Sequence, residues 1–125
     1  MLRCSQAGHN SFVVALAVVP AGVNEAVPGL GIVSGGRDTT ARLWDVDTAA
    51  EVSTLAAHQY QVNAVGVMPT GEIVTGGLDG LLKVWKAGVE TVSAKEHEGP
   101  ILCMAVLQNG TLLTGELLTP CDLGT

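Results

Sequence analysis

The chain alternates short apolar segments with turns rich in Gly, Pro and Asp. In its most regular stretch, a mostly apolar run from Gln61 to Met68 is followed by the turn Pro69-Thr70-Gly71 and by the β-branched segment Glu72 to Gly76. Another tight turn precedes Leu81–Trp85, and a last one leads into the more polar Val89–Ala94. Short runs bounded by such turns are typical of β-strands. The pattern therefore predicts an all-β chain, with four strands in this stretch.

The same pattern recurs along the chain. A shift of 41 positions aligns Ile32–Asp38 with Ile73–Asp79, and a shift of 39 aligns His58 with His97. A period of about 40 residues with four antiparallel strands is typical of a β-propeller blade. We place the repeats as follows: repeat 1 at about 8–56, repeat 2 at about 57–95, a partial repeat 3 at about 96–116, and an off-pattern tail at 117–125.

Two segments depart from the repeat. Pro20 to Gly29 lengthens the first repeat, and we interpret it as an insertion between two strands, which belongs in a surface loop. In the tail, Pro120 and Cys121 stand where the repeat would have a strand. That departure favours the hypothesis that the last nine residues come from a shortened gene or gene model.

Composition and charge narrow the class of protein. The chain has 125 residues, of which 47% are hydrophobic and 14% charged, and its net charge is −6. This hydrophobicity argues against disorder, and the acidic balance disfavours a nucleic-acid binder because phosphates would be repelled. The longest apolar run, Phe12 to Val19, is shorter than the roughly 20 residues of a membrane-spanning helix. Cys4, Cys103 and Cys121 are widely spaced, which favours a reducing compartment, the cytoplasm and also the nucleus.

Short motifs in these repeats resemble the WD-repeat (WD40) family. The first repeat has Gly8-His9, Ser34-Gly35-Gly36-Arg37-Asp38 and Trp44-Asp45 in the family's order. The second keeps the His, the Gly-Gly turn and the Trp but loses the leading Gly and the final Asp, and the third departs after Thr114-Gly115. The resemblance implies two complete four-stranded propeller blades with a truncated third. It also implies a non-catalytic scaffold for protein–protein interactions.

The resemblance further implies a buried hydrogen-bonded network in each complete repeat. A Trp indole would donate to a Ser or Thr hydroxyl, the hydroxyl to a His, and the His to an Asp. The eight residues are Trp44, Ser34, His9 and Asp38 in the first repeat, and Trp85, Thr75, His58 and Asp79 in the second. Each bond contributes about 0.5–1.5 kcal/mol, but losing one partner leaves the others unpaired in the interior.

Catalysis is the alternative interpretation of Thr75, His58 and Asp79, which supply a hydroxyl, a base and a carboxylate. The structural interpretation is favoured because the set recurs at the same spacing with a Trp that catalysis does not require. The aspartates lie in no cluster of further ligands, so we expect no metal site, no cofactor and no enzyme activity. Gly35-Gly36 and Gly76-Gly77 lack the Lys-Ser/Thr of a phosphate loop, and we interpret them as close-packed strand glycines.

Three residues beside the turns are candidates for contact with a partner, namely Arg37, Tyr60 and Leu78. Exposed aromatic and Arg side chains often anchor interfaces, although Arg37 is also interpretable as a solvated turn residue. The stretch from Gly8 to His58 resembles the group of phospholipase A2-activating protein, whose propellers bind ubiquitin in protein degradation. That resemblance implies ubiquitin or a ubiquitinated protein as the partner. A WD-repeat adaptor of another pathway is the alternative.

The number of blades is too small for a closed ring. Propellers typically have 4 to 8 blades, because a blade cannot cover its own apolar faces. Val65, Val67 and Ile73 would otherwise lack cover on at least one side. We therefore expect that further blades or self-association complete the propeller. The competing hypothesis is a truncated fragment without independent function. The sequence leaves open the partner, the blade number and the oligomeric state.

Overall fold

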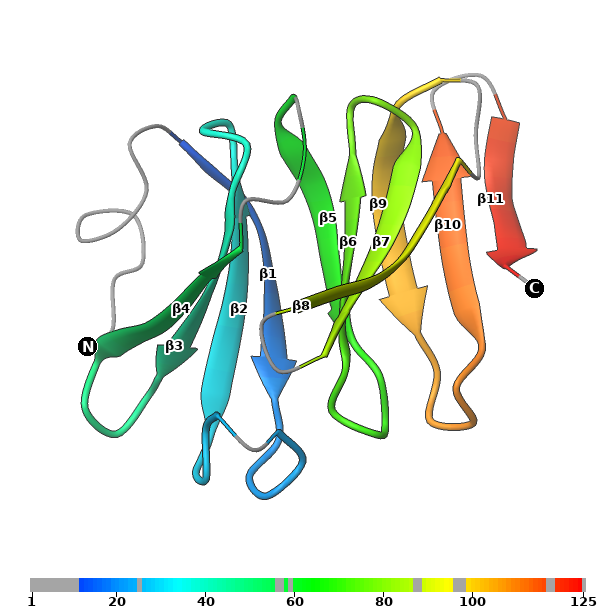
Figure 1. Cartoon of the computed structure of the whole chain (residues 1–125). Coiled ribbons are helices and arrows are strands. Elements are labelled where there is room, and N and C mark those ends of the chain that lie inside the picture. Colours follow the sequence, from blue (N-terminus) through cyan, green and yellow to red (C-terminus); the bar gives the residue numbers. More distant parts are fainter. Residues whose placement is uncertain are drawn as a thin grey trace.

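The computed structural model describes residues 12–24, 26–55, 58, 60–86, 89–95, 99–116 and 119–124. These residues form strands in three antiparallel sheets (Figure 1). The first sheet consists of β1 (Val13–Val19), β2 (Gly31–Gly36), β3 (Ala41–Asp45) and β4 (Ala50–Leu55). The second consists of β5 (Val62–Val67), β6 (Ile73–Gly77), β7 (Leu81–Lys86) and β8 (Val89–Lys95). The third consists of β9 (Ile101–Val106), β10 (Leu112–Glu116) and β11 (Thr119–Gly124).

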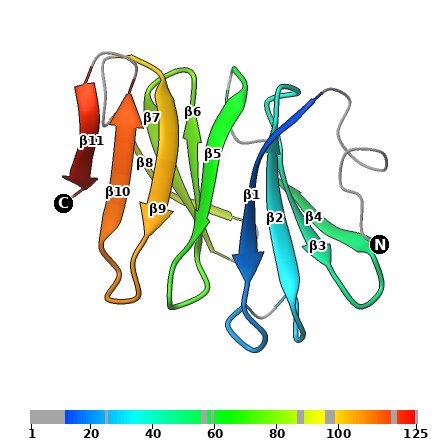
Figure 2. The ribbon, with the colours of Figure 1, turned by 180° about the vertical axis from the view of Figure 1, so that it is seen from behind.

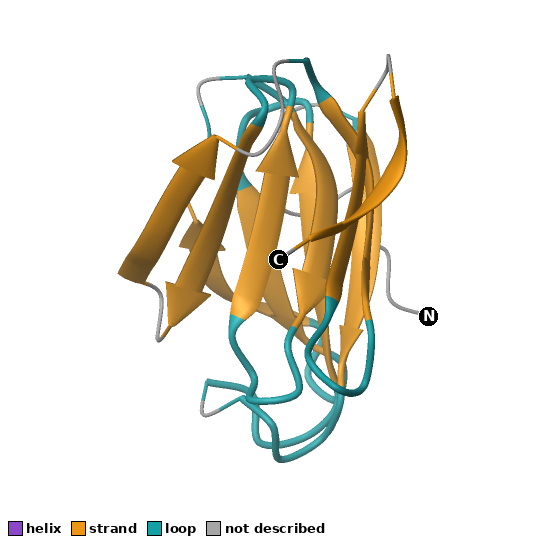
Figure 3. Ribbon diagram, turned by 90° about the vertical axis from the view of Figure 1, so that its right-hand side faces the viewer, coloured by secondary structure: helices purple, strands orange, loops and turns teal. Residues whose placement is uncertain are grey.

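The strands of each sheet follow one another in sequence order, as in a meander. The first strands of the sheets, β1, β5 and β9, lie side by side, and later strands lie farther out (Figure 2). The turns gather at the two ends of the strands (Figure 3). This is the arrangement of consecutive propeller blades in an open arc, which confirms the all-β prediction of two four-stranded blades and an incomplete third. The described part of the chain holds no helix that is long and apolar enough to cross a membrane.

The four strands expected in the second repeat are confirmed, with ends that differ by at most one residue. Each sheet of this chain is too small to enclose a core of its own, so the apolar side chains pack between sheets. One cluster between the first and second sheets includes Val33, Leu43, Val62 and Val65. A second cluster, around Ala64, Val74 and Ile101, lies between the second and third sheets.

Glycines permit this close approach of neighbouring sheets. A Cβ atom at Gly35 would lie 2.8 Å from Val62 Cγ1, and a Cβ atom at Gly76 would lie 2.9 Å from Ile101 Cγ2. Real Cβ atoms essentially never come so close to another carbon, so a side chain here would force the sheets apart. The interpretation as close-packed strand glycines is confirmed for Gly35 and Gly76.

The insertion between β1 and β2 lies at the surface only in part. Its residues Pro20 to Gly22 are exposed, but Val27 is fully buried in the core between the first two sheets. The Asn24 side-chain amide donates a hydrogen bond of 2.9 Å to the Gly71 carbonyl in the β5–β6 turn. The insertion therefore joins the first sheet to the second. The sequence analysis predicted a surface loop and did not predict this contact between sheets.

The tail also differs from its expectation. Residues Thr119–Gly124 form β11 and pair with β10, although the sequence pattern predicted no strand around Pro120 and Cys121. Among the described strands, β11 pairs with β10 alone and lies at the edge of its sheet. An edge strand accepts Pro because one side of it needs no backbone N–H donor for pairing.

Candidate functional site

The buried network of the second sheet joins four side chains around the Thr75 hydroxyl. The Trp85 indole N–H donates to Thr75 Oγ1 at 3.1 Å, and His58 Nε2 lies 2.9 Å from the same oxygen. A neutral His58 that donates through Nδ1 to a carboxylate has its acceptor at Nε2, so the Thr75 hydroxyl donates to Nε2. The other ring nitrogen, Nδ1, then carries a proton and donates to the Asp79 carboxylate, whose oxygens both lie 3.2 Å away.

This arrangement requires a neutral His58. Burial lowers the pKa of His58 below its ordinary value of 6.5, against the opposing attraction of Asp79. The backbone N–H of His58 donates to the Thr39 carbonyl in the β2–β3 turn, which ties the network to the first sheet. A Cβ atom at Gly77 would lie 2.7 Å from both His58 Nδ1 and Asp79 Oδ1. The glycine therefore leaves the space in which the His–Asp pair forms.

The network does not expose a nucleophile. Thr75 is fully buried, and its hydroxyl is shared between Trp85 and His58. A substrate would have to displace the indole or the imidazole to reach this oxygen. Among the described residues, no group of three or more His, Cys, Asp or Glu side chains could hold a metal ion. The geometry thus favours the structural interpretation of these residues over the catalytic one.

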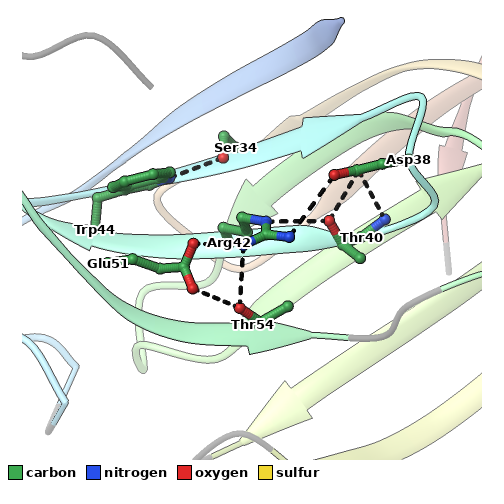
Figure 4. A network of polar contacts seen from close by, with 7 residues as sticks. All are labelled: Ser34, Asp38, Thr40, Arg42, Trp44, Glu51 and Thr54. Carbon is green, nitrogen blue, oxygen red and sulfur yellow. Dashed lines mark hydrogen bonds and ion pairs between the residues drawn. The ribbon is translucent and has the colours of Figure 1, made fainter. Parts of the chain in front are cut away.

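In the first sheet, the corresponding Trp44 indole donates to Ser34 Oγ at 2.9 Å (Figure 4). Asp38 accepts hydrogen bonds from the backbone N–H of Thr40 at 3.2 Å and from its hydroxyl at 2.8 Å, which closes the β2–β3 turn. His9, the remaining member predicted for this repeat, lies outside the described residues.

A second polar cluster lies on the outer strands, and the sequence analysis did not identify it. The Arg42 guanidinium is 2.6 Å from Glu51 and 3.8 Å from Asp38, and Thr54 donates to Glu51 at 2.6 Å (Figure 4). In the second sheet, Lys83 forms an ion pair of 2.8 Å with Glu90. In both sheets the glutamate of the cluster lies opposite the strand Trp in the register of the neighbouring strands: Glu51 opposite Trp44, and Glu90 opposite Trp85. The aligned Arg42 and Lys83 were the signal that could have revealed it.

The three candidate partner residues, Arg37, Tyr60 and Leu78, lie beside turns at one end of the sheets. Together with Phe12, which lies at the same end, they form what we call the upper rim. The Arg37 N–H donates to the Phe12 carbonyl at 2.9 Å, and the Leu78 N–H donates to the Gln61 carbonyl at 3.1 Å. These two contacts occupy equivalent places in the first and second sheets. They bring each turn beside the segment that enters the inner strand, so both sheets present these residues in the same way at the same end.

The side chains of the upper rim are exposed. Phe12 is 71% exposed, Tyr60 54% and Leu78 41%, and the Arg37 guanidinium carbon lies 5.2 Å from the centre of the Phe12 ring. At this distance a guanidinium is attracted to the face of an aromatic ring. The sequence analysis missed Phe12 because it opens an apolar run that reads as a strand. The structure places Phe12 one residue before β1, so this residue of the apolar run precedes the strand.

Known proteins resemble this chain in sequence and in fold. The family model described as WD domain, G-beta repeat, matches residues 2–45 and 49–86. Phospholipase A-2-activating protein of Xenopus laevis is 32% identical over 126 residues, which cover 91% of this chain and 15% of the relative. The guanine nucleotide-binding protein subunit beta of Arabidopsis thaliana is 30% identical over 116 residues, covering 86% of this chain and 29% of the relative. The chain thus spans less than a third of the length of either relative.

Among solved structures, the WD40 beta propeller domain of Doa1 has a TM-score of 0.70 with 24% sequence identity. The match covers 86% of this chain and 34% of the Doa1 chain, so the three sheets correspond to part of a propeller. At this identity the likeness concerns the fold. The family model, in contrast, covers well over half of the residues and includes the Trp of both complete blades. The chain belongs to the WD40-repeat family.

Proposed function

We propose that this WD40 chain binds ubiquitin or a ubiquitinated protein through its upper rim. The observation that carries the proposal is the set of exposed side chains at one end of both complete sheets, made by the Arg37–Phe12 pair, Tyr60 and Leu78. Members of the WD40 family are generally scaffolds for protein–protein interactions. The rim gives this general role a chemical basis, because it combines exposed aromatic, cationic and aliphatic side chains.

The composition of the rim suits a protein partner. Aromatic and Arg side chains dominate the binding energy of many interfaces: aromatic rings bury a large area with few rotatable bonds, and the Arg guanidinium offers several hydrogen-bond donors in one plane. The guanidinium of Arg37 lies over the ring of Phe12, and this attraction favours the paired arrangement before a partner binds. Tyr60 adds a hydroxyl that can hydrogen-bond to a partner while its ring is covered.

The identity of the partner rests on resemblance to the ubiquitin-binding group of WD-repeat proteins. The match to phospholipase A-2-activating protein over 91% of the chain supports membership of that group. A WD40 adaptor of another pathway would use the same rim with a different partner. We place the protein in the cytoplasm and also in the nucleus, where ubiquitinated proteins occur.

The test is an isothermal calorimetry experiment in which the chain is titrated with purified ubiquitin. Tyr60→Ala and Arg37→Ala should each weaken binding about tenfold, the usual effect of losing an interface anchor. Val89→Ala is the matched control, because Val89 is 63% exposed but lies on β8, away from the upper rim. It should bind as the wild type does.

Two results would contradict the proposal in different ways. Equal affinity of wild type, Tyr60→Ala and Arg37→Ala for ubiquitin would remove the rim as the binding surface. Absence of ubiquitin binding by a folded wild type would remove the partner and favour the adaptor of another pathway. A wild type that shows no cooperative melting transition would instead support the hypothesis of a fragment without independent function.

A further inference from the structure

The arc of three sheets ends in two exposed apolar faces. On β1, Ala15 and Ala17 pack toward the second sheet, and the alternating residues point the other way. The latter are Val14, Leu16 and Val18, which are 42%, 61% and 61% exposed and which we call the front face. On β9, Met104 packs toward the second sheet. Facing away there are Cys103 and Ala105, both exposed, which we call the back face.

The middle sheet shows how such faces are covered. Leu16 pairs with Ser34, Val65 with Thr75, and Met104 with Thr114, so these three inner-strand residues are equivalent. Val65 is only 7% exposed, because the first sheet covers it, whereas Leu16 has no such cover among the described residues. Equivalent positions are therefore buried in the middle of the arc and exposed at its front.

The back face follows the same rule. The 39-residue repeat places Cys103 at the position of Ala64 and Ala105 at that of Gly66. Ala64 is 4% exposed, and a Cβ atom at Gly66 would lie 2.8 Å from Val106 Cγ2 in the third sheet. The front and back faces are thus the two halves of a contact that the chain makes twice internally, once on each side of its middle sheet.

We propose that a second copy of this chain docks head-to-tail, with the front face of one copy on the back face of the next. A second copy is the partner that the repeat favours, because each chain carries the equivalents of both halves of the contact between its own sheets. Leu16 would lie over Gly115 of the neighbour's β10, as Val65 lies over Gly35 and Met104 over Gly76. Ala105 is small enough for this packing, since Ala17 holds the same position between the first two sheets.

The proposed assembly has a defined geometry. The contact is heterologous, so it forms a ring if the rotation between copies closes and an open chain of copies if it does not. Two copies bring together six sheets, which lies within the usual range of about 4 to 8 blades. Tyr60 and Leu78 lie on turns of the middle sheet and remain accessible, so this association leaves that part of the upper rim open to a partner.

Light scattering on a size-exclusion peak, with circular dichroism of the same peak, tests the proposal. The wild type should have strand signal and a mass of at least twice the 12.8 kDa of one chain. Leu16→Asp blocks the front face and Ala105→Asp blocks the back face, so each variant alone should be a folded monomer. An equimolar mixture should form a dimer, because the first variant retains its back face and the second its front face.

Val92→Asp is the matched control, since Val92 is 51% exposed on β8 and lies on neither face. It should keep the wild-type mass. Val18→Asp and Cys103→Asp serve as second variants if either first variant loses its strand signal. The proposal is overturned by a wild type that stays at 12.8 kDa at every concentration, by a polydisperse wild type without strand signal, or by variants that stay monomeric when mixed.

Discussion

Replacing Thr75 with Val tests the central hydrogen-bonded network. Val has nearly the same shape as Thr, so the substitution removes the hydroxyl with little change in packing. Thr75 is fully buried, and its hydroxyl serves both the Trp85 indole at 3.1 Å and His58 Nε2 at 2.9 Å. Thr75→Val therefore leaves one buried donor and one buried acceptor without their partner.

The expected loss of stability follows from these two groups. Each buried polar group left unpaired costs about 1–3 kcal/mol, and the methyl group that replaces the hydroxyl recovers about 0.8 kcal/mol. The net loss in the free energy of unfolding should be about 3 kcal/mol. This is a large part of the 5–15 kcal/mol that is typical of a whole domain.

Urea unfolding, monitored by Trp fluorescence, measures the effect. The protein concentration is kept fixed, because self-association would make the free energy of unfolding depend on it. Thr91→Val is the matched control in the same sheet. The Thr91 hydroxyl is exposed and donates to the Val84 carbonyl at 3.2 Å, so its loss should change stability by less than about 0.5 kcal/mol.

A double-mutant cycle separates the network from general packing. Trp85→Phe removes the indole N–H, so Thr75→Val should cost about 1 kcal/mol less in that background than in the wild type. The reasoning is refuted if Thr75→Val costs no more than Thr91→Val. It is also refuted if the cost is unchanged by Trp85→Phe, because the hydroxyl would then not be satisfying the indole.

Three further predictions concern acid, packing and salt. Burial lowers the pKa of His58, so the unfolded chain takes up a proton before the folded chain does as the pH falls. The free energy of unfolding should therefore be constant above about pH 7 and decrease below about pH 6.5. Urea midpoints measure this decrease, which should be smaller in a His58→Gln variant. Gly35→Ala should cost about 1–3 kcal/mol in urea unfolding, because its Cβ atom would lie 2.8 Å from Val62 Cγ1; an unchanged midpoint would contradict the close packing of the sheets. Arg42→Met removes the 2.6 Å ion pair with Glu51 and should cost about 1 kcal/mol or less at low salt; a loss that persists undiminished in 1 M NaCl would mean that the charge is not responsible.

The sequence by itself determined the strands of the second repeat and the partners in its network. Strand positions follow from apolar runs bounded by turn residues, which are local properties of the chain. The network followed from the resemblance to the WD40 family, whose motifs Thr75, Trp85 and Asp79 match at the spacing of their counterparts in the first repeat. Evenly spaced residues in a repeated fold occupy equivalent places, so their contacts could be anticipated without coordinates.

The tertiary structure alone decided the features that depend on how the sheets meet. The contact of Asn24 with Gly71 spans 47 positions and joins an insertion to a turn of another sheet. Phe12 belongs to an apolar run in the sequence, yet it lies on the exposed rim because the strand begins one residue later. The exposure of Leu16 and the burial of Val65, at equivalent positions, likewise depend on which sheet stands beside them. Periodicity records which side chains share a face of a strand, but whether that face is covered depends on packing between segments distant in sequence.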